Sequence, residues 1–124
     1  MTPAGVAAGL ILNVGYEPTL LETLTLVLRA AGYAVESASS IEAVMQHFRA
    51  AHFDVVVLCH SVPEQERQHL VGRIRELGSA TPVIFVSARS ASADRFADLT
   101  IDNRPTGLVS AVEQLLSQKE TGNK

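Results

Sequence analysis

The chain is poor in cysteine and in clustered positive charge, and both shortages exclude classes of protein. Its 124 residues include one cysteine, which excludes an internal disulfide framework and a multi-cysteine zinc site and fits a reducing compartment. The ten basic residues are scattered and the net charge is -3, whereas nucleic-acid surfaces carry clustered Lys and Arg. We therefore expect no direct contact with nucleic acid.

The N-terminal sequence lacks the marks of an export signal or a membrane anchor. No positive charge precedes the apolar run 4–14, since the first basic residue is Arg29, and the run is too short to span a bilayer. We expect a cytoplasmic protein without a membrane partner. The length and the 47% hydrophobic content predict one domain over 1–124, with its core at about 8–118 and a disordered tail at 119–124.

Short apolar runs alternate with longer amphipathic segments. The runs predict buried strands at 9–14, 33–37, 54–59 and 82–86. Such repeated strand-then-helix units predict an α/β fold, a doubly wound parallel sheet with helices on both faces. For its five strands we expect the common doubly wound order 2-1-3-4-5.

Capping residues set the ends of the predicted helices. The first runs from Pro18 to Ala31 and is ended by a left-handed Gly32. The second opens at a capping box formed by Ser39 and Glu42. Apolar stripes mark these helices, a third that closes at Gly78, and a last one near the C-terminus. The stripes are Leu20, Leu21, Leu24, Leu28 and Ala31; Ile41, Val44, Met45 and Phe48; Leu70, Ile74 and Leu77; Leu108, Ala111, Val112, Leu115 and Leu116.

One segment is too short for the pattern. About 16 residues separate Ser87 from Arg104, whereas two loops, a helix and a strand need about 20 or more. We expect a fourth helix, within 91–97, that is shortened or absent. The fifth strand, around 99–101, should be brief and lie at an edge of the sheet.

The predicted topology brings particular residues to one crevice, outside the carboxyl ends of the first and third strands where strand order reverses. The residues delivered there are Gly15, Tyr16, Cys59, His60, Ser87, Ala88 and Arg104. Cys59 and His60 do not make a nucleophile–base pair by being adjacent, because neighbouring strand residues point to opposite faces. We expect Cys59 to be a small buried hydrophobic residue.

Nearly the whole chain, from about residue 10 to 116, resembles the response-regulator receiver family. The resemblance rests on Val14-Gly15-Tyr16-Glu17-Pro18, on the run from Asp54 to Pro63, on Pro82-Val83-Ile84 with Ser87-Ala88, and on Arg104-Pro105. It implies a chemotaxis-type signalling domain of flavodoxin-like fold in a two-component phosphorelay. In that family, a pair of acids at the positions of Gly15 and Tyr16 holds Mg²⁺, and an aspartate at the position of Cys59 accepts the phosphoryl group. The resemblance further implies that Ser87 and Arg104 stand where a hydroxyl and a lysine contact that group.

Measured against that pattern, only Ser87 keeps the family's residue type. Glycine and tyrosine supply no carboxylate for Mg²⁺, and phosphoryl transfer depends on that metal. We therefore expect a degenerate receiver, not an enzyme and without metal or cofactor, that acts as a protein-interaction module. Its partner would be another signalling protein or an output domain, and a homodimer is left open. We expect Glu17 to favour the helix start, and the Tyr16 ring to fill the emptied volume and cover Cys59.

The sequence is also compatible with two other functions. Oxidation of Cys59 could replace phosphorylation as the input of a redox-responsive switch, which would need an exposed thiol in an electropositive setting. The same crevice could instead bind an anion or a small molecule. No glycine-rich phosphate loop supports that alternative, because Asn13-Val14-Gly15-Tyr16 offers one glycine only.

Overall fold

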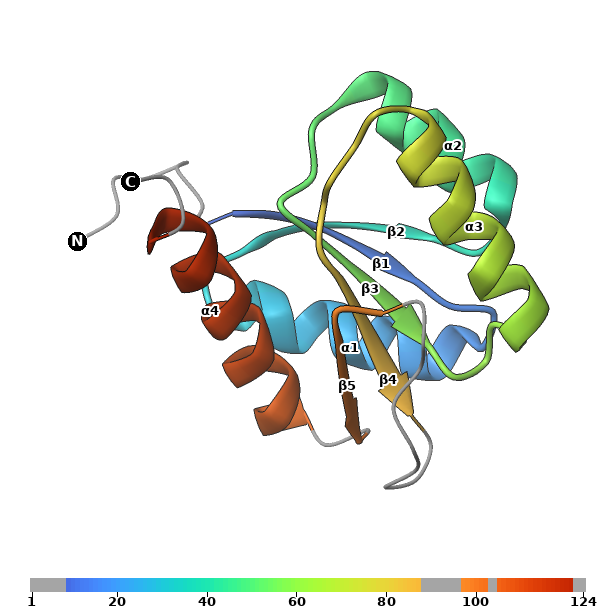
Figure 1. Cartoon of the computed structure of the whole chain (residues 1–124). Helices are drawn as coiled ribbons and strands as arrows, with labels where there is room; N and C mark the ends of the chain where they lie inside the picture. The colour runs from blue at the N-terminus through green and yellow to red at the C-terminus, as the bar shows by residue number, and fades with distance from the viewer. Residues whose placement is uncertain (1–8, 88–96, 103–104, 122–124) are drawn as a thin grey trace.

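The computed structural model describes residues 9–87, 97–102 and 105–121, and it shows alternating strands and helices (Figure 1). In chain order the elements are β1 (Leu10–Val14), α1 (Pro18–Ala30), β2 (Ala34–Ala38), α2 (Ile41–Ala50), β3 (Val55–Cys59), α3 (Glu64–Glu76), β4 (Val83–Ser87), β5 (Leu99–Asp102) and α4 (Pro105–Thr121). The strands form one sheet in the order β2-β1-β3-β4-β5, and every neighbouring pair is parallel. The predicted fold and strand order are confirmed.

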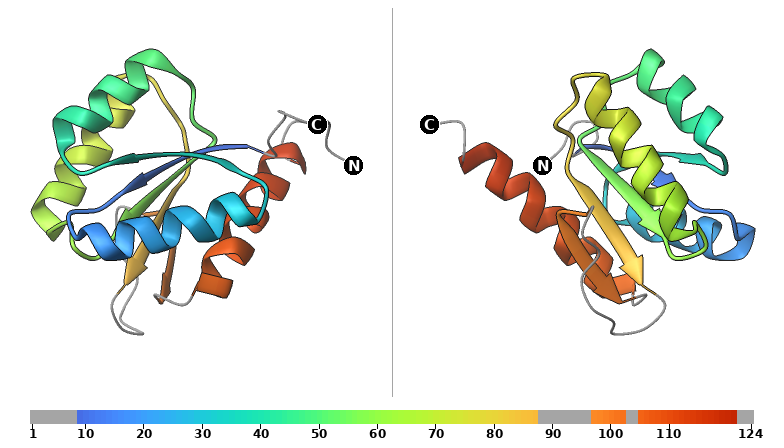
Figure 2. Two further views of the ribbon diagram at one scale, coloured as in Figure 1. Left: turned by 180° about the vertical axis from the view of Figure 1, so that it is seen from behind. Right: turned by 45° about the vertical axis from the view of Figure 1, so that its right-hand side comes forward.

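Helices cover both faces of the sheet, with α1 and α4 on one side and α2 and α3 on the other (Figures 1 and 2). Each face has its own apolar cluster, because strand side chains alternate between the faces. On β3, Val55, Val57 and Cys59 join the cluster under α1 and α4. Val56 and Leu58 join the cluster under α2 and α3. The crossover connections therefore bury β3 completely.

Glycines end two of the helices as the sequence predicts. Gly32 (φ 101°) follows α1 and Gly78 (φ 83°) follows α3, both in the left-handed region that costs glycine little. The amide of the next residue then bonds back into the helix, from Tyr33 N to the Leu28 carbonyl (3.2 Å) and from Ser79 N to the Ile74 carbonyl (3.3 Å). These bonds satisfy carbonyls that the last turn leaves free.

Three local predictions need correction. The cap of α2 is Ser40, whose Oγ accepts from Ala43 N (3.1 Å), and not Ser39, because Ala38 still pairs with β1 and Ser39 is needed to leave the sheet. Leu77 lies just beyond α3 and is 52% exposed; Val71 is buried on that helix instead. The backbone of α4 continues to Thr121, into the expected tail, because Gln118, Lys119 and Glu120 all favour helix.

The short β5 lies at the edge of the sheet, as predicted. The segment 91–97, where a shortened or absent fourth helix is expected, lies outside the described residues except for Ala97. Within the ranges that the structure describes, no helix is both long and apolar enough to cross a membrane.

Candidate functional site at the carboxyl ends of the strands

The carboxyl ends of β1 and β3 lie side by side at the centre of the sheet. Val14 pairs with Leu58, so the next residues, Gly15 and Cys59, meet just past the paired region. The chain leaves β1 for α1 on one face of the sheet and leaves β3 for α3 on the other. In an open parallel sheet this divergence makes the crevice where ligands bind.

Gly15 and Cys59 are in close contact. A Cβ atom built on Gly15 would lie 3.2 Å from both Cβ and Sγ of Cys59 and 3.4 Å from Oγ of Ser61. Contacts at 3.2 Å are tighter than carbon and sulfur atoms normally accept. The sequence thus uses glycine here for the close approach of β1 to β3, and Cys59 fills the space beside it.

Cys59 ends a buried chain of hydrogen bonds on the α1 side of the sheet. Its thiol, with no exposed surface, donates to Oδ1 of Asn13 (3.7 Å). Asn13 is equally buried, and its Nδ2 donates to Oγ1 of Thr25 (3.0 Å) and to the Leu21 carbonyl (3.1 Å). Burial raises the pKa of Cys59 from 9.0 to about 12. The expectation that Cys59 is a small buried residue is confirmed.

Tyr16 points to the opposite side of the sheet. Its ring packs against the α2–α3 cluster, and its hydroxyl donates to Oε1 of Glu66 on α3 (2.5 Å). Burial raises the pKa of Tyr16 to about 12, and the hydrogen bond and negative charge of Glu66 add to the increase. The expectation that Tyr16 covers Cys59 is wrong, because consecutive residues leaving β1 serve different faces.

Ser61 joins the two loops that border the crevice. Its Oγ accepts from the backbone amides of Tyr16 (2.8 Å) and Glu17 (3.3 Å). The Glu17 carboxylate caps α1 and accepts from Thr19 N (3.2 Å) and Leu20 N (2.6 Å). The predicted role of Glu17 at the helix start is confirmed, and its oxygens are occupied by backbone donors.

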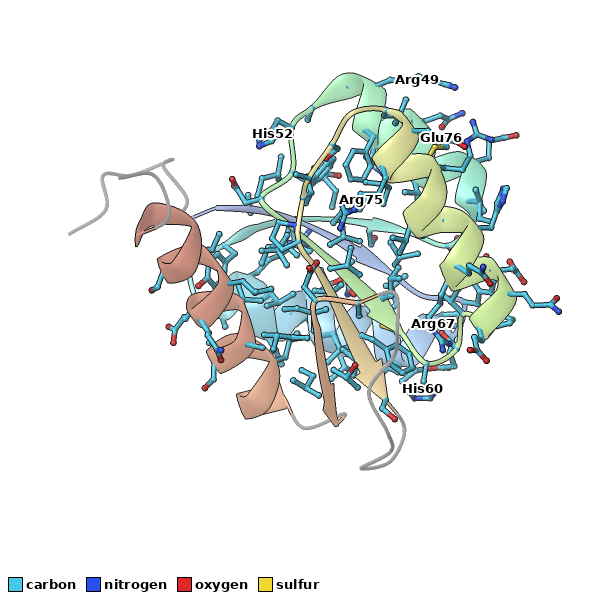
Figure 3. The ribbon with its side chains drawn as sticks, viewed as in Figure 1. Arg49, His52, His60, Arg67, Arg75 and Glu76 are labelled. Atoms are coloured by element: carbon cyan, nitrogen blue, oxygen red, sulfur yellow. The ribbon has the colours of Figure 1, made fainter. Side chains whose placement is uncertain are left out.

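The β4 side of the crevice carries a hydroxyl and a cation. Ser87 is buried at the end of β4, one residue past the pairing of Cys59 with Val86. Arg67 of α3 lies at the same end of the sheet (Figure 3), with its Cζ 4.0 Å from the centroid of the Phe85 ring. Its Nη1 donates to the Val62 carbonyl (2.7 Å). A guanidinium on an aromatic face is a stable arrangement for a partly buried cation.

The predicted site residues are thus only partly brought together. Gly15 and Cys59 meet, Tyr16 turns away, and Ser87 lies one strand further along. Arg104 and Ala88 fall outside the described residues. Among the residues described, no three His, Cys, Asp or Glu side chains gather closely enough to hold a metal ion.

The sequence reasoning missed three polar residues of this site. They are Asn13, Ser61 and Glu66, which bond to Cys59, to the β1–α1 loop and to Tyr16 respectively. Asn13 left a signal, because an amide inside the apolar run Leu10–Val14 must find partners when it is buried. Ser61 and Glu66 stand in ordinary polar segments and left none.

A doubly wound parallel sheet with its crevice between β1 and β3 defines a flavodoxin-like α/β domain. The chain belongs to the response regulator receiver domain family, whose model matches residues 11–104. It is therefore a signalling domain of the two-component type.

Known proteins agree with this assignment. The transcriptional regulatory protein BasR of Escherichia coli (strain K12) is 32% identical over 91 residues, which are 73% of this chain and 41% of BasR. The chain thus spans about two fifths of that relative. The receiver domain protein (CheY-like) from Methanospirillum hungatei has the same fold, with a TM-score of 0.79, 20% identity and coverage of 92% of this chain and 98% of that one. The response regulator TrrA from Thermotoga maritima, solved in complex with Mg²⁺ and BeF, has a TM-score of 0.72 at 24% identity, covering 86% and 98% of the two chains.

Proposed function

We propose that this receiver domain signals without accepting a phosphoryl group and works as a protein-interaction module. The observation that carries the proposal is the contact between Gly15 and Cys59. The family resemblance implies an acid at each position, but a side chain at position 15 would begin with a Cβ 3.2 Å from Cys59 Sγ. The two strand ends are packed for a glycine and a thiol, which supply no carboxylate oxygen.

The crevice residues do not fit Mg²⁺. That ion needs hard oxygen ligands in near-octahedral geometry, and the thiol of Cys59 is soft and protonated, with its pKa raised to about 12 by burial. The Glu17 carboxylate accepts two backbone hydrogen bonds of α1. The Tyr16 hydroxyl is bonded to Glu66 on the far side of the sheet. We therefore expect no phosphoryl transfer at this site.

A redox switch at Cys59 has less support. The thiolate is the form that reacts with oxidants, and the buried thiol donates its proton to Asn13. A raised pKa and the absence of exposed surface are the opposite of what such a switch needs. Binding of an anion or small molecule in the crevice stays a hypothesis that no contact in the described residues favours.

The partner we infer is an output domain or another signalling protein. BasR is named as a transcriptional regulator and is longer than this chain, which matches 41% of it. A receiver whose crevice cannot be switched by a phosphoryl group would present one fixed surface to such a partner. Interaction in the cytoplasm through that surface is the mode of action we propose.

Beryllium fluoride with Mg²⁺, followed by amide NMR, tests the loss of phosphoryl chemistry. TrrA is the positive control because it was solved with these ions. We expect TrrA to respond and this chain to show no Mg²⁺-dependent shifts at Gly15 or Cys59. Intact-mass spectrometry after incubation with acetyl phosphate should show no adduct.

The variant Cys59→Asp should also stay unmodified, since positions 15 and 16 still supply no metal ligand. Its amide spectrum reports whether it folds. A stable stoichiometric phosphoryl adduct on the folded native chain would refute the proposal.

A further inference from the structure

The outer face of α1 carries an apolar residue between two opposite charges. Leu26 is 56% exposed, and it and Leu77 are the two exposed large hydrophobic residues among those described. Glu22 and Arg29 are exposed on either side of it. Figure 2 (left) shows α1 crossing the front of the molecule with no helix in front of it. This face is distinct from the buried face that packs on the sheet.

Both charges lack an ion-pair partner in the part of the chain that the structure describes. Arg29 uses one nitrogen, Nη2, to donate to the Val35 carbonyl of β2 (3.0 Å), which holds the guanidinium along the free edge of that strand. A guanidinium has five N–H donors, so Arg29 can still pair with a carboxylate. Glu22 and Arg29 are seven residues apart, two turns or about 10 Å along one face.

A groove of about 380 Å³ runs between this face and the strand β2. Leu21, Thr25 and Leu26 line it from α1, and Ser37 and Ser39 line it from β2 and the residues that follow. Leu21 and Leu26 give the groove an apolar part. The volume of the groove is larger than that of a leucine side chain.

We propose that this face binds a second copy of the same chain, with the two α1 helices antiparallel about a two-fold axis. The axis would pass beside Leu26, close to the midpoint between residues 22 and 29. Antiparallel pairing then sets Glu22 of each copy opposite Arg29 of the other, and each Leu26 over the other's groove. The face is self-complementary in charge, as a two-fold interface requires. Any other protein would have to present the same charges in the reverse order.

The α2 helix provides a matched control for the outer face of α1. On α2, Glu42, Gln46 and Arg49 have the same spacing as Glu22, Leu26 and Arg29 and are all exposed. Position 46 is polar, so the α2 face offers the charges without the apolar centre. We expect it to remain solvated, because exposed ion pairs alone contribute little to association.

Self-association through α1 does not depend on whether the crevice accepts a phosphoryl group. Sedimentation equilibrium of the full chain at low salt should show a monomer–dimer equilibrium that weakens at physiological salt, where charges are screened over about 8 Å. Glu22→Arg and Arg29→Glu should each raise the dimer dissociation constant about tenfold or more, because each replaces two attractive pairs by two repulsive ones. Mixing the two variants should restore association, since both pairs are then attractive again.

The control substitutions Glu42→Arg and Arg49→Glu should leave the equilibrium unchanged, alone and mixed. Leu26→Gln, which gives α1 the pattern of α2, should weaken the dimer by at least about tenfold, and its thermal unfolding should stay native because Leu26 is exposed. A chain that is monomeric at low salt overturns the proposal, as does a dimer that Leu26→Gln leaves intact or a mixture that fails to recover. A monomer whose α1 amides respond only to a different signalling protein would assign the face to that partner and likewise refute self-association.

Discussion

On the α1 side of the sheet the crevice ends in a buried chain of hydrogen bonds, whereas on the α3 side it ends in a contact that solvent reaches. The first side joins Cys59, Asn13 and Thr25 without exposed thiol or amide. The second joins Tyr16 to Glu66, and both side chains are half-buried. Two neighbouring residues of one loop, Gly15 and Tyr16, thus contribute to environments of different polarity and packing.

This contrast in burial distinguishes the structural part of the crevice from its rim. Removing the hydrogen-bond partner of a buried polar group costs much folding stability, because no water takes the place of that partner. Removing a partner at the exposed rim costs little stability, because water takes its place. Substitutions on the Cys59 side should therefore affect folding, while those on the Tyr16 side should leave it nearly unchanged.

The largest expected effect concerns the reactivity of Cys59. Burial raises its pKa from 9.0 to about 12, which lowers the thiolate fraction at neutral pH by about a thousandfold. A thiol reagent followed by absorbance should react very slowly with the folded chain and fast after denaturation. Reaction at the rate of a free thiol, persisting below neutral pH, would contradict the burial of Cys59 in this chain of hydrogen bonds. It would then favour the redox-switch hypothesis.

Asn13→Ala should have the largest effect on stability. It leaves the thiol of Cys59 and the hydroxyl of Thr25 without their shared partner and opens a small cavity, at a cost of about 2–4 kcal/mol. Urea unfolding followed by circular dichroism measures this cost. The control is Thr23→Ala on the exposed side of α1, where the hydroxyl bonds to the Thr19 carbonyl and the loss should be under about 0.5 kcal/mol. Equal losses for the two variants would show that the buried chain adds nothing.

Gly15→Ala should cost about 1–3 kcal/mol by overpacking. Its new Cβ meets Cys59 Cβ and Sγ at 3.2 Å. The matched control is Gly72→Ala in α3, where nothing lies within 4 Å, and which should stabilise by about 0.5–1 kcal/mol through helix propensity. In a Cys59→Ala background, which removes the sulfur, the cost of Gly15→Ala should fall. An unchanged cost would place the strain elsewhere.

These residues also show how far the sequence alone could reach. Periodicity predicted the strands and the helices that cover both faces of the sheet, and glycine predicted the helix ends at Gly32 and Gly78, because these features depend on local spacing and backbone geometry. The strand order was expected from the common doubly wound topology. Periodicity also predicted that Cys59 is buried. The direction of Tyr16 was predicted wrongly, since the chain turns within one residue of leaving β1.

The partners of Asn13 and Tyr16 depend on long-range packing. Thr25 and Glu66 reach them from separate helices, and no spacing in the sequence encodes those distances. The capping residue of α2 was predicted wrongly for a local reason, because Ser39 and Ser40 are both good capping residues. Only the end of pairing at Ala38 decides between them.

The smallest expected effect is that of Tyr16→Phe. At neutral pH it removes one partly exposed hydrogen bond to Glu66, at a cost of about 0.5–1 kcal/mol. Folding raises the pKa of Tyr16 from 10.0 to about 12, so its contribution is fully present below pH 10, where both states hold the proton. That contribution is lost between pH 10 and 12, where the unfolded chain releases the proton first. Tyr16→Phe should therefore reduce the alkaline loss of stability.

Cys59→Ala provides the comparison for this alkaline effect. The pKa of Cys59 rises from 9.0 to about 12, so the loss of stability that it causes begins one pH unit lower, near pH 9. Urea unfolding of the two variants between pH 8 and about pH 11 should show the larger change for Cys59→Ala, since this side chain is fully buried. If Tyr16→Phe instead abolished more of the alkaline loss than Cys59→Ala, the α3 side and not the α1 side would be the structural part of the crevice.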